Sequence, residues 1–267
     1  DDNWFDIGTT AYLQTDLAED GEAVRLNTVT YAPPGDGPFP LALMHHGSTG
    51  MGTNPTDFDY IWSNDWLADL LNAHGWIAVF PQRRGRGLSD GLYDEGFASD
   101  RSEGYALEAA LSIPGAERAL TDANAALTAL RKQPNVAPGR VLVGGVSRGG
   151  VVAILQAGSQ PKEVAGVLNF VGGWVNGNVG DPTVNPTLFG RIGSFSGSVL
   201  SIYGEQDPFY TIEHSKTNVA EIAARNPNSE MQVVKLPGYG NGHWALSVPN
   251  LWEDKVEAFL RKSGNTP

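Results

Sequence analysis

The sequence predicts a three-layer α/β/α sandwich built around a mostly parallel β-sheet. Short runs of apolar residues, each of strand length, alternate with longer segments whose apolar residues recur at helical spacing. Strands that are apolar throughout must be buried on both faces, as they are in a parallel sheet covered by helices. The glycine-rich and polar motifs come directly after the expected strands, which is where such sheets gather their functional groups.

The expected elements follow in strand–helix order over most of the chain. Strands are expected at 24–32, 41–47, 76–82, 140–147, 164–173, 198–207 and 231–238. Helices are expected at 56–75, 115–133, 148–158, 211–226 and 250–264. The first helix is expected to bury an apolar face made of Ile61, Trp62, Trp66 and Leu70. Because no internal repeat or linker interrupts this order, we expect residues 1–267 to form a single domain.

Composition and charge restrict the classes of function. The chain carries 30 acidic and 18 basic residues, a formal net charge of −12, so we expect no nucleic-acid partner. It has no cysteine, which excludes disulfides, thiolate metal sites and a cysteine nucleophile. No apolar run approaches the roughly 18 residues of a membrane span, so none is expected. The start, DDNW without an initiator methionine, indicates either a processed mature terminus or a shortened chain, and we expect an exported protein.

The strongest single motif is Gly-Val-Ser-Arg-Gly at 145–149, a G-x-S-x-G pentapeptide between an expected strand and an expected helix. Such a sharp turn leaves the serine strained and exposed, and glycine is favoured two positions away because larger side chains would clash. The helix start supplies free N–H groups and a partial positive charge beside the hydroxyl. We predict that Ser147 is a nucleophile. The alternative is a tight glycine-rich turn or a phosphate-binding loop, although neither phosphate-loop pattern occurs.

A serine nucleophile needs a general base, which is expected after an acid that itself follows the serine in the chain. Of the five histidines, only His214 and His243 come after Ser147. His243 lies in the glycine-rich stretch GYGNGHWAL after the last expected strand, where a loop can bring an imidazole to the serine. His214 lies within an expected helix among charged neighbours, where we expect a solvated surface group. We therefore predict that His243 is the base.

The acid that orients the imidazole is expected just after a late strand. Asp207, in LSIYGEQDPF, occupies that position and is our prediction. An Asp-Pro pair can also be a simple turn former, and Glu205 and Asp181 are the alternative acids.

The segment His45-His46-Gly47-Ser48-Thr49-Gly50 follows an early strand and predicts the rest of an oxyanion hole. A backbone N–H from this loop, from Ser48 first and Thr49 second, would complement the N–H of Arg148. Adjacent histidines point in different directions, and no third ligand recurs at a suitable spacing. We therefore expect His46 to brace the loop, and we expect neither a metal nor a cofactor.

The segments HHGSTG, GVSRGG, GEQDPF and GNGHW occur in an order that resembles the α/β-hydrolase superfamily across nearly the whole chain. Within it, QRRGRGLSDG at 82–91 is similar to the loop after the fourth strand in the dienelactone-hydrolase-like and prolyl-oligopeptidase-like branches. The resemblance implies an eight-stranded, mostly parallel sheet and hydrolysis through an acyl-enzyme, without implying a substrate. The chain differs from dienelactone hydrolases proper, which use a cysteine, and lacks room for the accessory domain of the prolyl oligopeptidases.

Two segments are candidates for covering the site. The stretch between the strands at 164–173 and 198–207 is too short for a large cap, and the irregular segment 92–114 is the other candidate. A thin cover predicts an open site for small or extended acyl groups. Four aromatic residues close to the motifs are candidates for substrate contact, with ordinary core packing as the alternative: Trp174, Phe209, Tyr210 and Trp244.

Arg83, Arg84 and Arg86 follow an expected strand, and two interpretations of them stay open. One arginine could bind a substrate carboxylate in a bidentate manner. Alternatively, they pair with nearby acids such as Asp90 or Asp94.

The sequence therefore predicts a serine esterase that acts on small-molecule carboxylic esters. A peptidase or amidase of the same fold stays open, because no sequence feature separates it from an esterase. A non-catalytic binding protein on a hydrolase scaffold is the third possibility, and a broken triad would favour it.

Overall fold

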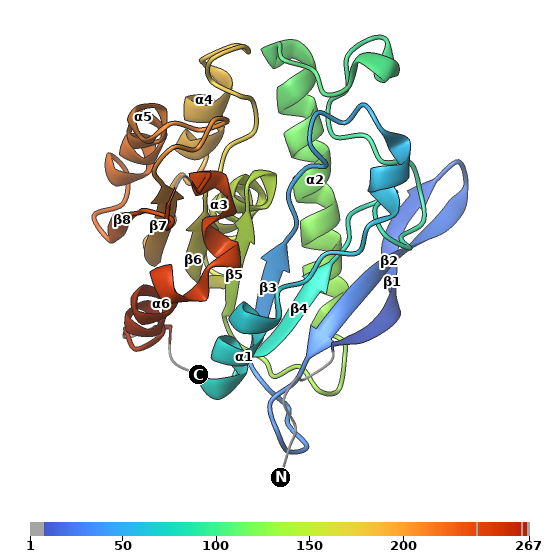
Figure 1. The fold of residues 1–267 in the computed structure, drawn as a ribbon. Coiled ribbons are helices and arrows are strands. Elements are labelled where there is room, and N and C mark those ends of the chain that lie inside the picture. Colours follow the sequence, from blue (N-terminus) through green and yellow to red (C-terminus); the bar gives the residue numbers. More distant parts are fainter. Residues whose placement is uncertain (1–7, 239, 263, 266–267) are drawn as a thin grey trace.

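A computed structural model describes residues 8–238, 240–262 and 264–265, which form a sheet of eight strands flanked by helices (Figure 1). The strands are β1 (Thr9–Glu19), β2 (Glu22–Tyr31), β3 (Leu41–His45), β4 (Ile77–Pro81), β5 (Val141–Val146), β6 (Val164–Phe170), β7 (Ser198–Gly204) and β8 (Ser229–Val234). Their order across the sheet is β1-β2-β4-β3-β5-β6-β7-β8. Only the β1–β2 and β2–β4 pairs are antiparallel, so the predicted eight-stranded, mostly parallel sheet is confirmed.

The helices are α1 (Asp65–Ala73), α2 (Ala109–Leu130), α3 (Arg148–Ser159), α4 (Val184–Gly190), α5 (Ile212–Ala223) and α6 (Glu253–Leu260). Helix α2 packs against α3, α3 against α4 and α4 against α5. Helices α1 and α6 cover the opposite face of the sheet (Figure 1). The stretch between β6 and β7 contains only the seven-residue helix α4. None of the helices described is long and apolar enough to cross a membrane.

Burial explains which strands the sequence reveals. Every residue of β3 and β4 is buried, and both strands read as continuous apolar runs. Strand β1, which was not anticipated, lies at the sheet edge, and Leu13 is its only fully buried residue. An edge strand with mostly polar, exposed residues produces neither an apolar run nor a clear alternation.

The helix expected at 56–75 is instead two elements. A 3-10 helix, η1, spans Pro55–Asp59, and α1 begins at Asp65, where the Asn64 side chain accepts a hydrogen bond from the Leu67 N–H. The expectation that Trp66 faces the core is wrong, because it is 59% exposed. The later helix start places Leu67 and Leu71 on the buried face.

The helix expected at 115–133 begins six residues earlier, at Ala109, and includes Pro114. Proline usually marks a helix boundary, which is why the pattern predicts a start after it. Gly115 here packs against the backbone of Glu95, where an added Cβ would lie 2.2 Å from the carbonyl carbon. Residues 109–114 thus belong to α2, and 92–108 remains as a segment that is irregular except for a 3-10 helix, η2, at Arg101–Glu103.

Candidate active site

Ser147 lies at the sharp turn between β5 and α3, and its backbone adopts φ 55° and ψ −121°. This is a strained conformation for a residue with a side chain, of the kind that accumulates at functional sites. A Cβ on Gly145 would lie 2.3 Å from the Gly149 carbonyl oxygen, and one on Gly149 would lie 2.0 Å from the His45 oxygen. The two glycines thus leave room for a turn that larger residues would block, as the motif predicts.

His243 and Asp207 come together from separate loops. His243 lies in η3 (Gly242–Ser247) after β8, and its Nδ1 is 2.9 Å from Oδ2 of Asp207, which follows β7. The other carboxylate oxygen accepts hydrogen bonds from the backbone N–H groups of Phe209 and Tyr210, at 2.8 and 3.0 Å. An ionised carboxylate only accepts, so it selects the tautomer with hydrogen on Nδ1 and leaves Nε2 free to take a proton.

The alternative acids and base lie elsewhere. Glu205 is exposed, and Asp181 is a partly buried residue that accepts hydrogen bonds from Thr183. The expectation that His214 is a solvated surface group is wrong, because it is partly buried and its Nε2 lies 2.9 Å from the amide nitrogen of Asn185. Burial lowers the pKa of His214 below its usual value. His214 belongs to α5 and Asn185 to α4, and the two helices pack against each other.

The loop after β3 touches the serine. A Cβ built on Gly47 would lie 3.0 Å from Ser147 Cβ and 3.7 Å from Ser147 Oγ. The Thr49 N–H, the second candidate for an oxyanion donor, already donates to the Tyr105 hydroxyl at 3.0 Å. Arg148 is the first residue of α3, and the first N–H groups of a helix have no intrahelical partner. Ser48 and Arg148 therefore remain the predicted pair of donors.

A cavity of about 490 Å³ joins these groups, and Ser147, His243, Ser48 and Arg148 all line it. The four predicted aromatic residues also line it, namely Trp174, Phe209, Tyr210 and Trp244. Trp174 and Tyr210 are 2% and 5% exposed, so they belong both to the core and to the cavity wall. Phe209 packs against the His243 ring with centroids 4.8 Å apart. The contact of these residues with substrate stays a prediction.

Tyr210 adds a neutral phenol beside the nucleophile. Burial raises the pKa of Tyr210 to about 12, although the nearby Arg148 and an interaction with the Ser147 side chain act in the opposite direction. The phenol therefore stays protonated at neutral pH and is available as a hydrogen-bond donor.

Sequence reasoning found Trp244 but missed the rest of an apolar rim around the cavity. Met51, Tyr60, Leu107 and Val179 line the cavity and, like Trp244, are large apolar side chains exposed to solvent. We call these five residues the apolar rim. Leu107 comes from the 92–108 segment, which therefore contributes to the wall. The rim residues come from loops far apart in the sequence, so no local pattern could have brought them together.

The interpretation that the clustered arginines pair with acids holds for Arg83 and Arg84, but the acids named for it, Asp90 and Asp94, are wrong. Asp90 pairs with Arg25 at 2.9 Å, and Asp94 lies 3.7 Å from Arg101. The chain folds back after the arginines, and the Gly85 N–H donates a hydrogen bond to the Asp90 carbonyl oxygen. The acids that are close in sequence therefore contact other partners.

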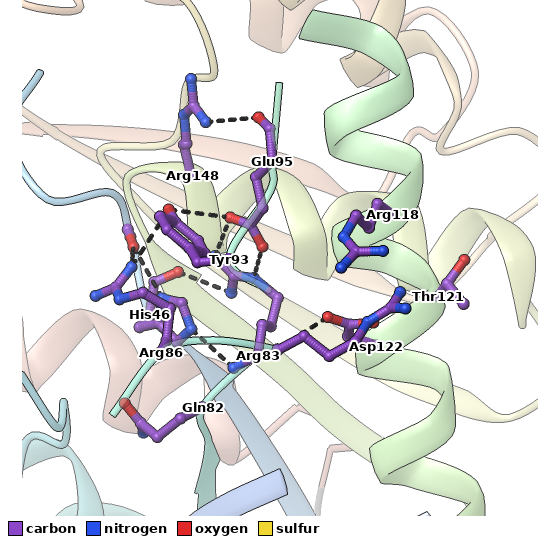
Figure 2. A network of polar contacts seen from close by, with 12 residues as sticks. His46, Gln82, Arg83, Arg86, Tyr93, Glu95, Arg118, Thr121, Asp122 and Arg148 are labelled. Carbon is purple, nitrogen blue, oxygen red and sulfur yellow. Dashed lines mark hydrogen bonds and ion pairs between the residues drawn. The ribbon is translucent and has the colours of Figure 1, made fainter. Parts of the chain in front are cut away.

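The actual partners of the arginines are buried. Arg84 pairs with Asp122 on α2 at 2.7 Å, and Arg83 forms a two-point ion pair with Glu95 (Figure 2). Burial alone would raise the pKa of Glu95, but Arg83, with Arg148 and Arg86, holds it below its usual value. Of the three clustered arginines, Arg86 lines the cavity.

The two adjacent histidines have protein partners. His45 Nε2 lies 2.7 Å from the Gln156 side-chain oxygen, and His46 Nδ1 lies 2.8 Å from the Gly47 carbonyl oxygen. Burial lowers the pKa of His45 to about 4 and that of His46 well below its usual value, so both rings are neutral at pH 7. Within 8–238, 240–262 and 264–265, no group of three or more His, Asp or Glu residues is placed to hold a metal ion.

The sheet, the strained serine after β5 and the loops at the strand ends define the α/β-hydrolase fold class. Residues 50–243 match the model of the Dienelactone hydrolase family. The chain belongs to this family, as its resemblance at 82–91 suggests. No curated protein sequence matches the chain.

Similar solved structures include esterases. The Pyrococcus furiosus esterase Pf2001 is 16% identical over 97% of this chain and 91% of its own, with a TM-score of 0.64. Est1E from Butyrivibrio proteoclasticus, solved with bound ferulic acid, is 15% identical over 94% of this chain and 97% of its own, with a TM-score of 0.64. At these identities the likeness supports the fold.

Proposed function

We propose that the protein hydrolyses carboxylic esters through an acyl-enzyme on Ser147. One observation carries the proposal: the strained Ser147 and His243 line the same cavity, and His243 is paired through Nδ1 with Asp207 from a third loop. Membership of a hydrolase family and the esterase structural neighbours support the same reaction class.

In the proposed reaction, Ser147 Oγ attacks the ester carbonyl carbon as its proton moves to His243 Nε2. The carbonyl oxygen becomes an oxyanion that accepts hydrogen bonds from the N–H groups of Ser48 and Arg148. Collapse breaks the bond to the alcohol oxygen, which leaves with the proton from His243. Water then attacks the acyl group, gives its proton to His243, and the carboxylic acid leaves as Ser147 recovers its hydrogen. Asp207 stabilises the imidazolium that forms in both steps.

The walls of the cavity indicate the substrate class. A cavity of about 490 Å³ is of the usual size for small-molecule sites. Aromatic side chains and the apolar rim favour an ester with an apolar or aromatic group. The ferulic acid bound by the neighbour Est1E is an aromatic acid, which is consistent with this substrate class.

The test compares Ser147→Ala with Ser102→Ala, a control at an exposed serine that does not line the cavity. With a p-nitrophenyl ester, we expect Ser147→Ala to lose turnover by about 10⁴-fold or more, while the control keeps the wild-type rate. Equal turnover in wild type and Ser147→Ala would exclude the assignment. Matched ester and amide substrates on the wild type then separate an esterase from an amidase.

A further inference from the structure

The peptide bond between Gly47 and Ser48 lies between the nucleophile and a buried group of polar side chains. On one side, Gly47 packs against Ser147 so closely that an added Cβ would lie 3.0 Å from Ser147 Cβ. On the other side, the Gly47 carbonyl oxygen accepts hydrogen bonds from Arg86 Nη1 at 2.9 Å and from His46 Nδ1 at 2.8 Å. The two donors fix the direction of this carbonyl.

A trans peptide is planar, with its C=O and N–H groups pointing in opposite directions. Holding the Gly47 carbonyl toward Arg86 and His46 therefore turns the Ser48 N–H the other way. Ser48 and Ser147 both line the cavity. The direction of the Gly47 carbonyl thus determines whether the Ser48 N–H faces the position of the oxyanion.

The His46 ring has one tautomer that satisfies its neighbours. The Gly47 oxygen can only accept, so Nδ1 must carry the hydrogen, and Nε2 accepts from the Arg83 backbone N–H at 3.0 Å. The Arg83 guanidinium in turn donates to the His46 carbonyl at 3.0 Å and pairs with Glu95. The imidazole is therefore held on both sides.

Two tyrosines, Tyr93 and Tyr105, contact Arg86 and Thr49, which follows Ser48 in the loop after β3. The Arg86 guanidinium carbon lies 5.1 Å from the centre of the Tyr93 ring, and the hydroxyls of Tyr93 and Tyr105 are 2.8 Å apart. The Tyr105 hydroxyl accepts the Thr49 N–H at 3.0 Å. The loop is thus held by its Gly47 carbonyl and its Thr49 N–H, on either side of the Ser48 N–H.

We propose that Arg86 and His46 are positioning residues that hold the Gly47–Ser48 peptide with its N–H toward Ser147, so that the oxyanion hole is formed before substrate binds. This inference rests on the proposed ester hydrolysis. A donor fixed in advance stabilises developing charge without reorganisation, whereas a rotated peptide would present a carbonyl oxygen to the oxyanion. We call the hydrogen bonds from Arg86 and His46 to the Gly47 carbonyl oxygen the clamp. Loss of the clamp should destabilise the transition state more than it weakens substrate binding.

The main test compares Arg86→Met with Arg84→Met. Both arginines are buried and lie two residues apart, but Arg84 contacts Asp122 and does not line the cavity. We expect Arg86→Met to lower kcat by about 10- to 100-fold with KM changed less than about threefold, because one oxyanion donor is worth about 10²- to 10³-fold. Arg84→Met should keep kcat within about threefold once thermal melting confirms that both variants are folded.

A second readout separates positioning from general disruption. A trifluoromethyl ketone forms a tetrahedral oxyanion adduct with a serine, whereas the product acid binds without one. In Arg86→Met, the affinity for the ketone should fall by the same factor as kcat/KM, while inhibition by the product acid stays unchanged. An unchanged kcat and ketone affinity, or an equal loss for ketone and product acid, would overturn the proposal.

Two substitutions at His46 test the hydrogen bond itself. The amide nitrogen of asparagine can occupy the place of Nδ1, whereas a glutamine amide reaches the place of Nε2. We expect His46→Asn to keep kcat within about tenfold and His46→Gln to behave like Arg86→Met. Equal loss in the two variants, or a larger loss in His46→Asn, would contradict the role of Nδ1.

The failure of the clamp can be distinguished from the failure of the proposed function. If Ser147→Ala keeps turnover, or if a fluorophosphonate does not label Ser147, the hydrolase assignment fails and the clamp fails with it. If Ser147 is required but Arg86→Met labels and turns over at the wild-type rate, only the clamp is overturned.

Discussion

The two borders of the cavity are built in opposite ways. The inner border is polar and buried: Arg83 and Glu95 are 1% and 2% exposed and pair with each other behind the oxyanion loop. The apolar rim is exposed, with Trp244 60% and Tyr60 66% accessible to solvent. A buried charge is costly unless it is paired, so the inner border contributes to the stability of the fold. The apolar rim contains no buried charge, and we expect it to affect substrate choice alone.

After the loss of the nucleophile itself, the largest effect on turnover is expected at Asp207, the acid paired with His243. Replacing Asp207 by Asn should lower kcat/KM by about 10³- to 10⁴-fold, because an amide no longer selects the Nδ1–H tautomer of His243. The matched control is Glu205→Gln, two residues away at an exposed position. Steady-state assays near pH 8 provide the measurement, and a larger loss in the control would transfer the role to Glu205.

The next effect is on stability. Glu95→Gln should lower the free energy of unfolding by about 3–5 kcal/mol, because Arg83 is left buried without its carboxylate. The neighbouring Asp94→Asn should change it by no more than about 1 kcal/mol, because the Asp94–Arg101 pair is exposed. Urea denaturation at pH 7 measures both values. Similar losses in the two variants would remove the distinction between buried and exposed pairs.

The same pair predicts a pH dependence. Because the pKa of Glu95 is held below its usual value in the folded protein, its ionisation contributes stability above its unfolded pKa of about 4.3. That contribution is lost as the pH falls through the lower, folded pKa. The difference in stability between wild type and Glu95→Gln should therefore be constant above pH 5 and shrink below about pH 4. A difference that is constant down to the lowest pH at which both proteins fold would exclude this linkage.

The smallest effect is expected at the rim. Trp244→Ala should raise KM for an aromatic ester by about 2- to 12-fold, as expected for the loss of about 0.5–1.5 kcal/mol of aromatic contact, with kcat and the melting temperature unchanged. Trp66→Ala is the control, since Trp66 is equally exposed, at 59%, but lies on α1 outside the cavity lining. If both variants have the same KM, the rim does not contact the substrate.

Sequence patterns reveal the parts of this molecule that depend on local rules. The buried strands appear as apolar runs, and the turn at Ser147 requires the glycines on either side. The pairing of His243 with Asp207 could be anticipated, because both residues follow strands whose carboxyl ends lie on the same edge of a parallel sheet. The catalytic roles of these residues stay predictions.

The remaining features depend on contacts between distant segments. Arg83 reaches Glu95 across an irregular loop, and Arg84 reaches Asp122 on α2, so neither partner follows from sequence neighbours. The exposed strand β1 has no apolar pattern. Of the clamp on Gly47, the sequence predicts only that His46 braces its loop. The contribution of Arg86 required the arrangement in space.

The most direct test of the central claim is mass spectrometry after reaction with a fluorophosphonate. We predict one adduct per chain, located on the peptide that contains Ser147, with labelling slowed by an ester substrate and abolished in Ser147→Ala. A wild-type protein that stays unmodified, or a Ser147→Ala variant that is labelled as fast as the wild type, would contradict the account.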